Sequence, residues 1–371
     1  MKKIFFLILF IIPYFIIPAT ADYQQNIDYC RAKIISIIDQ TKTENGAEYT
    51  ETVFTFNVLS GKYAGSQKTL VFKGQTDVPN YMKYRKGDNV FIGVNTVYTT
   101  DGKDEYISIY DIDNSRGLIV LLVFVLILLL VVGKLRGLLS LAGLLITVLL
   151  IFFIYIPLTL KGFSPFVSTF LVCFISILIT IPVITGFSLK TMNAVAGAFS
   201  GIIFSMVLCA VIGGAMHLSG IVTDDLLTVF YVSNVNINLV EIALSGMILS
   251  SLGAVTDISV SVSSAINEFF VVHPGVDFKT AFKSAMEVGR DNLGSMVNTL
   301  IMAYVGSSVA LVLIIYIKYD STMPFSMIFS HNEILVEILR SFAGCAGMII
   351  SVPVTAYVGV KLNMMKRKNA S

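Results

Sequence analysis

Seven apolar runs follow one another from Gly117 to Lys361, and they decide what this chain can fold into. Each is roughly twenty residues long, the length that a helix rising about 1.5 Å per residue needs to cross a membrane. Hydrophobic residues make up 55% of the chain and charged residues only 13%, whereas about a quarter is usual in a soluble domain. This pattern predicts a bundle of membrane helices. It excludes a soluble enzyme, a disordered chain and a nucleic-acid-binding protein.

Basic residues are concentrated in alternate gaps between these runs, which predicts the orientation of the chain. The spans are expected near Gly117–Gly133, Gly137–Leu160, Val167–Gly186, Val195–His217, Leu239–Phe270, Asp291–Ile317 and Ile334–Lys361. One set of gaps carries Lys134, Arg136, Lys190, Lys279, Lys283, Arg290, Lys361, Lys366, Arg367 and Lys368, and the other carries only Lys161 and Lys318. The positive-inside rule then predicts a plasma-membrane protein whose basic tail, residues 363–371, is cytosolic.

The N-terminal segment, Met1 to Ala21, has the features of an export signal. Two lysines precede an apolar run from Ile4 to Ile17, and Ala19-Thr20-Ala21 matches the small-x-small pattern that signal peptidase requires. The alternative is an uncleaved anchor helix, because the run is nearly long enough to span the hydrocarbon. Either interpretation exports the polar segment that follows.

Residues 22–116 alternate in polarity like a half-buried sheet. We expect five short strands, near Arg31–Ile38, Glu51–Leu59, Lys68–Lys73, Asn89–Val97 and Glu105–Ile112, separated by turn signals. Five strands without a long helix favour a small barrel of the OB or SH3-like type. The segment contains no histidine and no convergent acid pair, so a structural, interaction or gating role is expected there. The membrane domain should follow over residues 117–362.

Two spans carry small residues at helical spacing, which predicts close helix packing. In the fourth span these include Gly197, Gly201 and Gly213, and in the seventh Gly347 and Gly359. Lines of small side chains let one helix backbone approach another.

The fifth span differs because one of its faces is polar. At about 100° per residue, Gly246, Ser250, Gly253, Asp257, Ser261, Ser264 and Glu268 fall within an arc of about 80°. Asp257 lies near the middle of this stripe. Since a charged carboxylate at membrane depth is costly, it is expected to face the bundle interior, either on a transport pathway or as a hydrogen bond between helices.

The sixth span begins with a second polar face that contains Asp291 and Asn298. Arg290 lies about 100° away from it. Three roles remain open for Arg290: an ion pair with Glu287, a pair with Asp257 or Glu268 on the neighbouring helix, or a marker of the cytosolic membrane boundary.

Three segments together resemble the YibE/F family of bacterial multi-pass membrane proteins. They are residues 253–257 (GAVTD), 288–295 (VGRDNLGS) and 298–306 (NTLIMAYVG). The resemblance covers the chain from about Gly117 to the C-terminus. It implies the multi-pass architecture, and transport is the usual supposition for the family. It also draws attention to Asp257, Arg290, Asp291 and Asn298, but it names no substrate.

The leading hypothesis is therefore a transporter or channel-like permease that moves a proton, an ion or a small polar solute past Asp257. One alternative is a non-transporting scaffold or receptor that binds a partner through the exported domain. Another is the membrane subunit of an ATP-driven system, whose ATPase would be a separate chain because no GxxxxGK[ST] loop occurs here. A homo-oligomer also stays open. No enzyme activity is expected, since there is no GxSxG elbow and no HExxH site. No cofactor or metal site is implied.

Overall fold

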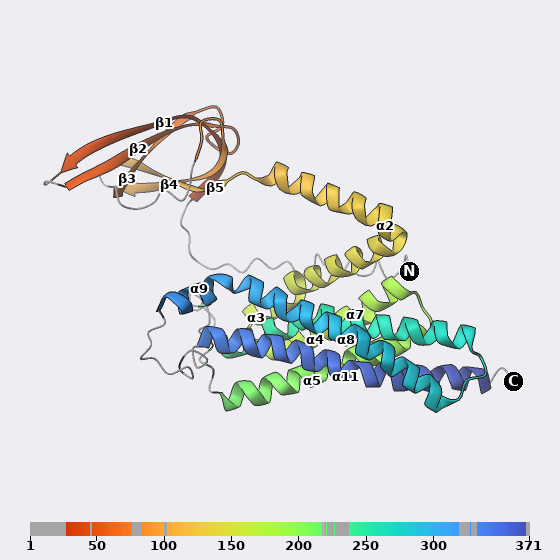
Figure 1. Ribbon diagram of the computed structural model, residues 1–371. Coiled ribbons are helices and arrows are strands. Elements are labelled where there is room, and N and C mark those ends of the chain that lie inside the picture. Colours follow the sequence, from red (N-terminus) through yellow and green to blue (C-terminus); the bar gives the residue numbers. More distant parts are fainter. Residues whose placement is uncertain are drawn as a thin grey trace. The chain divides into compact units, whose positions relative to one another are not determined.

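The computed structural model describes residues 27–368 apart from 45–46, 76–83, 100–101 and most of 217–236 and 319–331. The predicted export signal lies outside the described residues. The chain divides into two compact units, one reaching to Val131 and the other beginning at Val132. The first unit holds the strands and the start of the first long helix, and the second holds the other helices (Figure 1).

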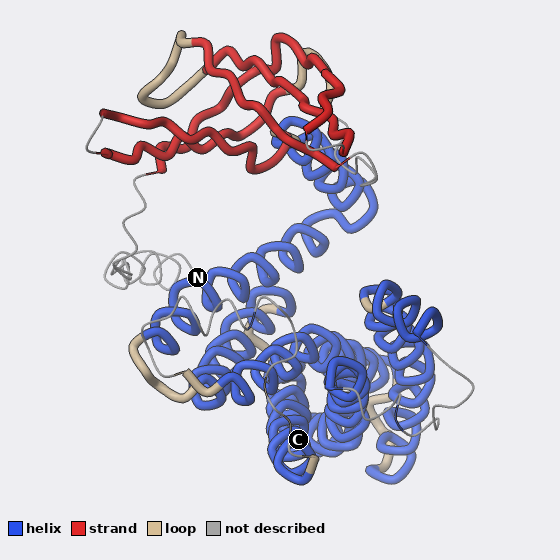
Figure 2. Tube along the Cα trace, turned by 90° about the vertical axis from the view of Figure 1, so that its left-hand side faces the viewer, coloured by secondary structure: helices blue, strands red, loops and turns tan. Residues whose placement is uncertain are grey.

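Five antiparallel strands form one sheet, as the alternating pattern predicts (Figure 2). They are β1 (Ile27–Glu44), β2 (Ala47–Val58), β3 (Gln67–Gln75), β4 (Asn89–Thr99) and β5 (Gly102–Ile112), in the order β3-β2-β1-β4-β5. The central strand β1 pairs with β2 from Ala32 to Glu44 and with β4 from Ile27 to Lys33.

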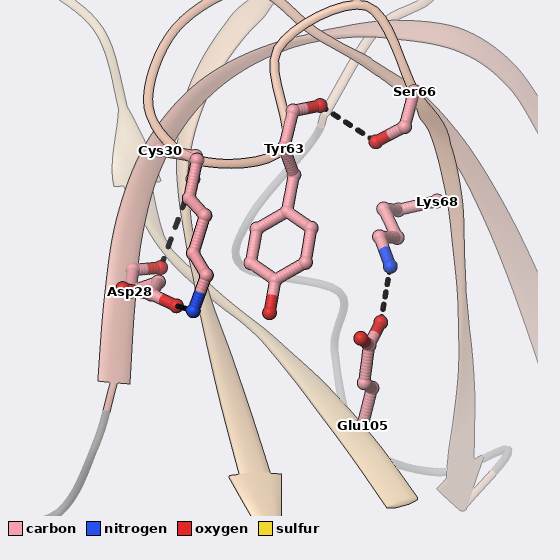
Figure 3. A network of polar contacts seen from close by, with 7 residues as sticks. Asp28, Cys30, Tyr63, Ser66, Lys68 and Glu105 are labelled. Carbon is pink, nitrogen blue, oxygen red and sulfur yellow. Dashed lines mark hydrogen bonds and ion pairs between the residues drawn. The ribbon is translucent and has the colours of Figure 1, made fainter. Parts of the chain in front are cut away.

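One face of this sheet forms a small apolar core. Alternate residues of β1, β2 and β4 are buried there, among them Ile34, Phe56 and Ile92. The two edge strands are also linked, since Lys68 on β3 forms an ion pair with Glu105 on β5 (Figure 3). The Lys68 ammonium lies 4.5 Å from the centre of the Tyr63 ring. The sheet is thus strongly curved, while its closure into a barrel stays a prediction.

The strands connect to the first long helix through a polar junction. Arg31 Nε lies 3.2 Å from Asp113 Oδ2, and the backbone N–H of Ser115 donates to Asp113 Oδ1 at 3.1 Å. The hydrogen bond from the Ser115 side chain is the main cause that holds the pKa of Asp113 below its ordinary value, and the Ser115 N–H and the Arg31 charge lower this pKa further. The carboxylate therefore accepts at the start of the helix, where negative charge is favourable.

Among the described residues, six helices are long and apolar enough to cross a membrane, and a bent pair of helices supplies a seventh candidate. They comprise α2 (Ser115–Leu150), continued by η2 (Ile151–Tyr155) and α3 (Ile156–Leu160), then α4 (Pro165–Thr185), α5 (Leu189–Ala215), α7 (Leu239–Val272), α8 (Phe278–Ser307) with α9 (Val309–Lys318), and α11 (Asn332–Lys368). Within α2, Lys134 leaves helical geometry with φ of 50° and ψ of −143°. This break separates the first two spans near the predicted position.

The sixth predicted span is not a straight helix from Asp291 to Ile317. Helix α8 already begins at Phe278, well before the predicted start of the span at Asp291. The axis then bends by 59° between α8 and α9. The N–H of Ser308, the residue between them, donates to the carbonyls of Tyr304 and Val305.

The core of the helical unit lies where α5, α7 and α11 meet, and the small residues are part of that contact. A Cβ atom built on Gly201 would lie 2.6 Å from the carbonyl oxygen of Gly347. The hydroxyl of Ser205 donates to the carbonyl of Ala343 at 2.8 Å. Gly197 lies against Thr355, Gly359 against Ile266 and Asn193, and Gly213 against Leu244 of α7. Four of these five glycines thus join α5 or α7 to α11, and Gly213 joins α5 to α7.

All four cysteines, Cys30, Cys173, Cys209 and Cys345, are free and buried. Cys30 belongs to the core of the sheet, and the other three belong to the helical core. They act as small apolar side chains there.

Candidate functional site

The polar stripe of α7 lies on the exposed side of that helix. Asp257 and Glu268 are exposed, and Ser261 and Ser264 are half-buried. The opposite side of α7 is buried, and its core residues include Met247, Val255 and Ile258. The stripe therefore faces away from the α5, α7 and α11 core. Apolar residues of α7 fill the α5, α7 and α11 core, and Asp257 lies on the other side of the helix. Its position inside a bundle therefore stays a prediction.

The two acids of the stripe are unpartnered among the described residues. Within the described part of the chain, Asp257 forms no hydrogen bond or ion pair, and Glu268 forms none either. The serines behave differently, since the hydroxyl of Ser264 donates to the carbonyl of Val260 at 2.6 Å and that of Ser250 to Met247 at 2.8 Å. Placing an unpartnered Asp in lipid costs about 2.5–3.5 kcal/mol on insertion scales. Asp257 is therefore the group on this face that most needs a polar environment.

The polar residues of α8 lie on the side of that helix nearest α7. Ser284 lines the contact with α7, where Ala265 and Phe269 lie beside Ala281 and Ala285. Asp291, Ser295 and Asn298 follow Ser284 by seven, eleven and fourteen residues, so all three lie within about 40° of its direction. Asp291, Ser295 and Asn298 are exposed. We call these three residues, together with the α7 stripe from Gly246 to Glu268, the α7–α8 polar face.

Arg290 is exposed at the side of this face. It forms no ion pair with Glu287, Asp257 or Glu268 among the residues that the structure describes. The two ion pairs considered from the sequence are therefore not formed within one chain.

A second polar cluster connects α8 with α11, and sequence reasoning missed it. Arg340 pairs with Glu337 one turn earlier, with Nη1 and Oε1 2.7 Å apart. Among the described residues, Arg340 Nε, Glu337 Oε2 and the Tyr304 hydroxyl are buried without a hydrogen-bond partner. The Tyr304 hydroxyl also faces the side chain of Ser250 from α7. The cluster thus adjoins one end of the stripe. Opposite charges three residues apart inside an apolar span were the signal that could have revealed it.

Glu241 joins the N-termini of two helices. It accepts hydrogen bonds from Ser164 and from the backbone N–H of Phe166, at the start of α4, and from Asn238, which caps α7. A cavity of about 240 Å³ borders Glu241. Since two positive helix ends meet this carboxylate, its contacts are those of a structural cap.

The described residues contain no group of three or more His, Cys, Asp or Glu side chains that is able to hold a metal ion. The polar face instead offers isolated carboxylates, hydroxyls and an amide. Such a set can bind and release a proton, a hydrated cation or a hydrogen-bonding solute.

The six apolar helices and the bent pair define the class of this chain as a multi-pass membrane protein. The model of the YibE/F-like protein family matches residues 121–364, and the chain belongs to that family. This match confirms the resemblance drawn from the three segments of α7 and α8. The comparison with curated proteins found no match, and neither did the comparison with solved structures.

Proposed function

We propose that this protein is a permease that moves a proton, an ion or a small polar solute across the plasma membrane along the α7–α8 polar face. One observation carries the proposal: Asp257 lies near the middle of a long apolar helix, in line with further polar residues. It is exposed and has no partner among the residues that the structure describes. Ionisable side chains at membrane depth are costly and commonly mark a proton or ion pathway.

Two neighbouring features support a continuous polar track. In one direction the stripe continues from Asp257 through Ser261 and Ser264 to Glu268. In the other it reaches Ser250, which faces Tyr304 beside the Glu337–Arg340 pair. From Ser250 to Glu268 the track covers about 27 Å at 1.5 Å per residue, close to the thickness of the hydrocarbon.

The test is flux through reconstituted vesicles. Purified protein in proteoliposomes receives a pH step, and a pH-sensitive dye inside reports proton movement; the same vesicles are then tested with sodium and potassium gradients. We expect the wild type to dissipate at least one gradient, Asp257→Asn to lose that flux, and Asp257→Glu to retain it in part. Glu333→Gln, at the start of α11, is the matched acid-to-amide control. Equal flux in wild type and Asp257→Asn would refute the assignment of Asp257.

A second candidate function is partner binding by the exported sheet, and an aromatic patch favours it. Tyr29, Tyr106 and Tyr110 are 63%, 60% and 46% exposed. Tyr29 and Tyr110 stack edge to face with their ring centroids 5.0 Å apart. Exposed aromatic groups are frequent anchors of protein interfaces. Deleting residues 22–113 separates the two functions, because a chain that keeps its flux without them does not need the sheet for transport.

A further inference from the structure

The α7–α8 polar face is open on the outside of the chain. No described atom lies within 4 Å of the position that a Cβ atom would take on Gly246 or Gly253. Asp257, Asp291 and Asn298 are exposed beside this open space. A pathway along this face consequently has one wall in a single chain and lacks the other.

Neither lipid nor the first span of the chain can supply the missing wall. Lipid tails offer no hydrogen bonds, so a face with an unpartnered carboxylate is poorly solvated there. The span from Gly117 to Gly133 contains only apolar residues between its two glycines. It has no side chain able to donate to Asp257. The second span is already engaged, since the Thr147 hydroxyl lies 2.7 Å from that of Ser176 on α4.

A second copy of the chain has the required chemistry at the required depth. Helices α7 and α8 run antiparallel from the turn between His273 and Asp277. The length of α7 from Asp257 to this turn is nearly the same as the length of α8 from the turn to Arg290. At 1.5 Å per residue, the two residues therefore differ in membrane depth by about 5 Å. A two-fold axis along the membrane normal keeps equivalent residues at equal depth. Arg290 of one copy then reaches the level of Asp257 in the other.

We propose that two copies of this chain associate through their α7–α8 polar faces around such a two-fold axis. Asp257 of each copy meets Arg290 of the other, and the open space over Gly246 and Gly253 lets the two α7 helices approach closely. The polar track is thereby enclosed between two copies. Its role as a pathway rests on the proposed function, whereas the contact itself rests only on the polarity and exposure of the face.

Cross-linking in native membranes tests this contact directly. Ser261→Cys places a thiol on the polar face, and Val207→Cys places one on the apolar exposed side of α5, where Val207 is 55% exposed. The wild type is the baseline, because its four cysteines are buried. After treatment with a short bis-maleimide, we expect a covalent dimer with Ser261→Cys and none above the baseline with Val207→Cys.

Mass measurement of the wild-type protein in nanodiscs is the second readout, and it needs no substitution. We expect the mass of two chains, and its loss to one chain in Arg290→Gln. A one-chain mass for the wild type, or equal cross-linking of both cysteine variants, would overturn the proposal. The flux assay is independent: a dimer without flux overturns the permease alone, and an Asp257-dependent flux from single chains overturns the dimer alone.

Discussion

Replacing Gly201 by alanine should loosen the contact between α5 and α11. The added Cβ atom would lie 2.6 Å from the carbonyl oxygen of Gly347 and 2.6 Å from Cγ1 of Val255. Ordinary contacts of carbon atoms are about 3.5–4.0 Å, so relief needs a shift of about 1 Å. The oxygen belongs to a helix backbone and cannot rotate away.

The expected cost combines two effects. Overpacking a close contact costs about 1–3 kcal/mol. The hydrogen bond from Ser205 to the Ala343 carbonyl spans the same crossing, and its loss adds about 0.5–1.5 kcal/mol. Alanine regains up to about 1 kcal/mol of helix propensity over glycine. We therefore expect Gly201→Ala to lower the free energy of unfolding by about 1–3 kcal/mol.

The measurement is an SDS titration of the purified protein in mixed micelles, followed by far-UV circular dichroism because the chain contains no tryptophan. Gly214→Ala, on the same helix, is the matched control, since no described atom lies within 4 Å of its Cβ position. A midpoint for Gly201→Ala that equals those of the wild type and the control would show that the two helices do not approach this closely.

Three further substitutions test other parts of the structure. Glu337→Gln leaves the Arg340 charge without its ion-pair partner. Because the pair is partly exposed, we expect the free energy of unfolding to fall by about 1–3 kcal/mol in the same titration. If the effects of Glu337→Gln and Arg340→Gln add independently in a double-mutant cycle, the pairing is contradicted. Gly93→Ala puts a Cβ atom 2.4 Å from the Tyr110 ring, and separating Tyr110 from Tyr29 should cost about 1 kcal/mol and change the near-UV circular dichroism; an unchanged spectrum would refute this. The hydrogen bonds that Asp277 accepts from Thr280 lower the pKa of its carboxyl. The stability that this carboxylate contributes is therefore complete above its unfolded pKa of about 3.9 and is lost as the pH falls through the lower folded pKa. Relative to Asp277→Asn, the wild type should lose thermal stability below about pH 4, and parallel pH profiles of the two proteins would disprove the contribution.

The spacing of polar and apolar residues predicted the helix stripe and the strands, because each follows from a regular repeat along one element. The stripe of α7 follows from the 100° step alone, and five strands occur where alternation predicts them. Their ends were less predictable: the first strand was expected over Arg31–Ile38 and extends over Ile27–Glu44, because pairing with β2 continues through polar residues that carry no alternating signal.

The bend between α8 and α9 and the environment of Asp257 could not be predicted from the residues of one helix alone. The bend at Ser308 follows no proline, and hydropathy does not distinguish a bent span from a straight one. Periodicity locates the polar face that carries Asp257 but not the neighbours of that face, so the environment of Asp257 stays a prediction. The apolar face of α7, with Val255 and Ile258, competes for the same core and fills it.

The buried cysteines give this protein an internal reporter of local opening. A thiol without solvent contact reacts only after the structure around it has opened, so the rate of maleimide labelling measures the population of open states. Cys30 reports on the sheet, while Cys173, Cys209 and Cys345 report on the helical unit. Mass spectrometry of labelled peptides would then give the opening free energies of the two units separately, from one unmodified chain.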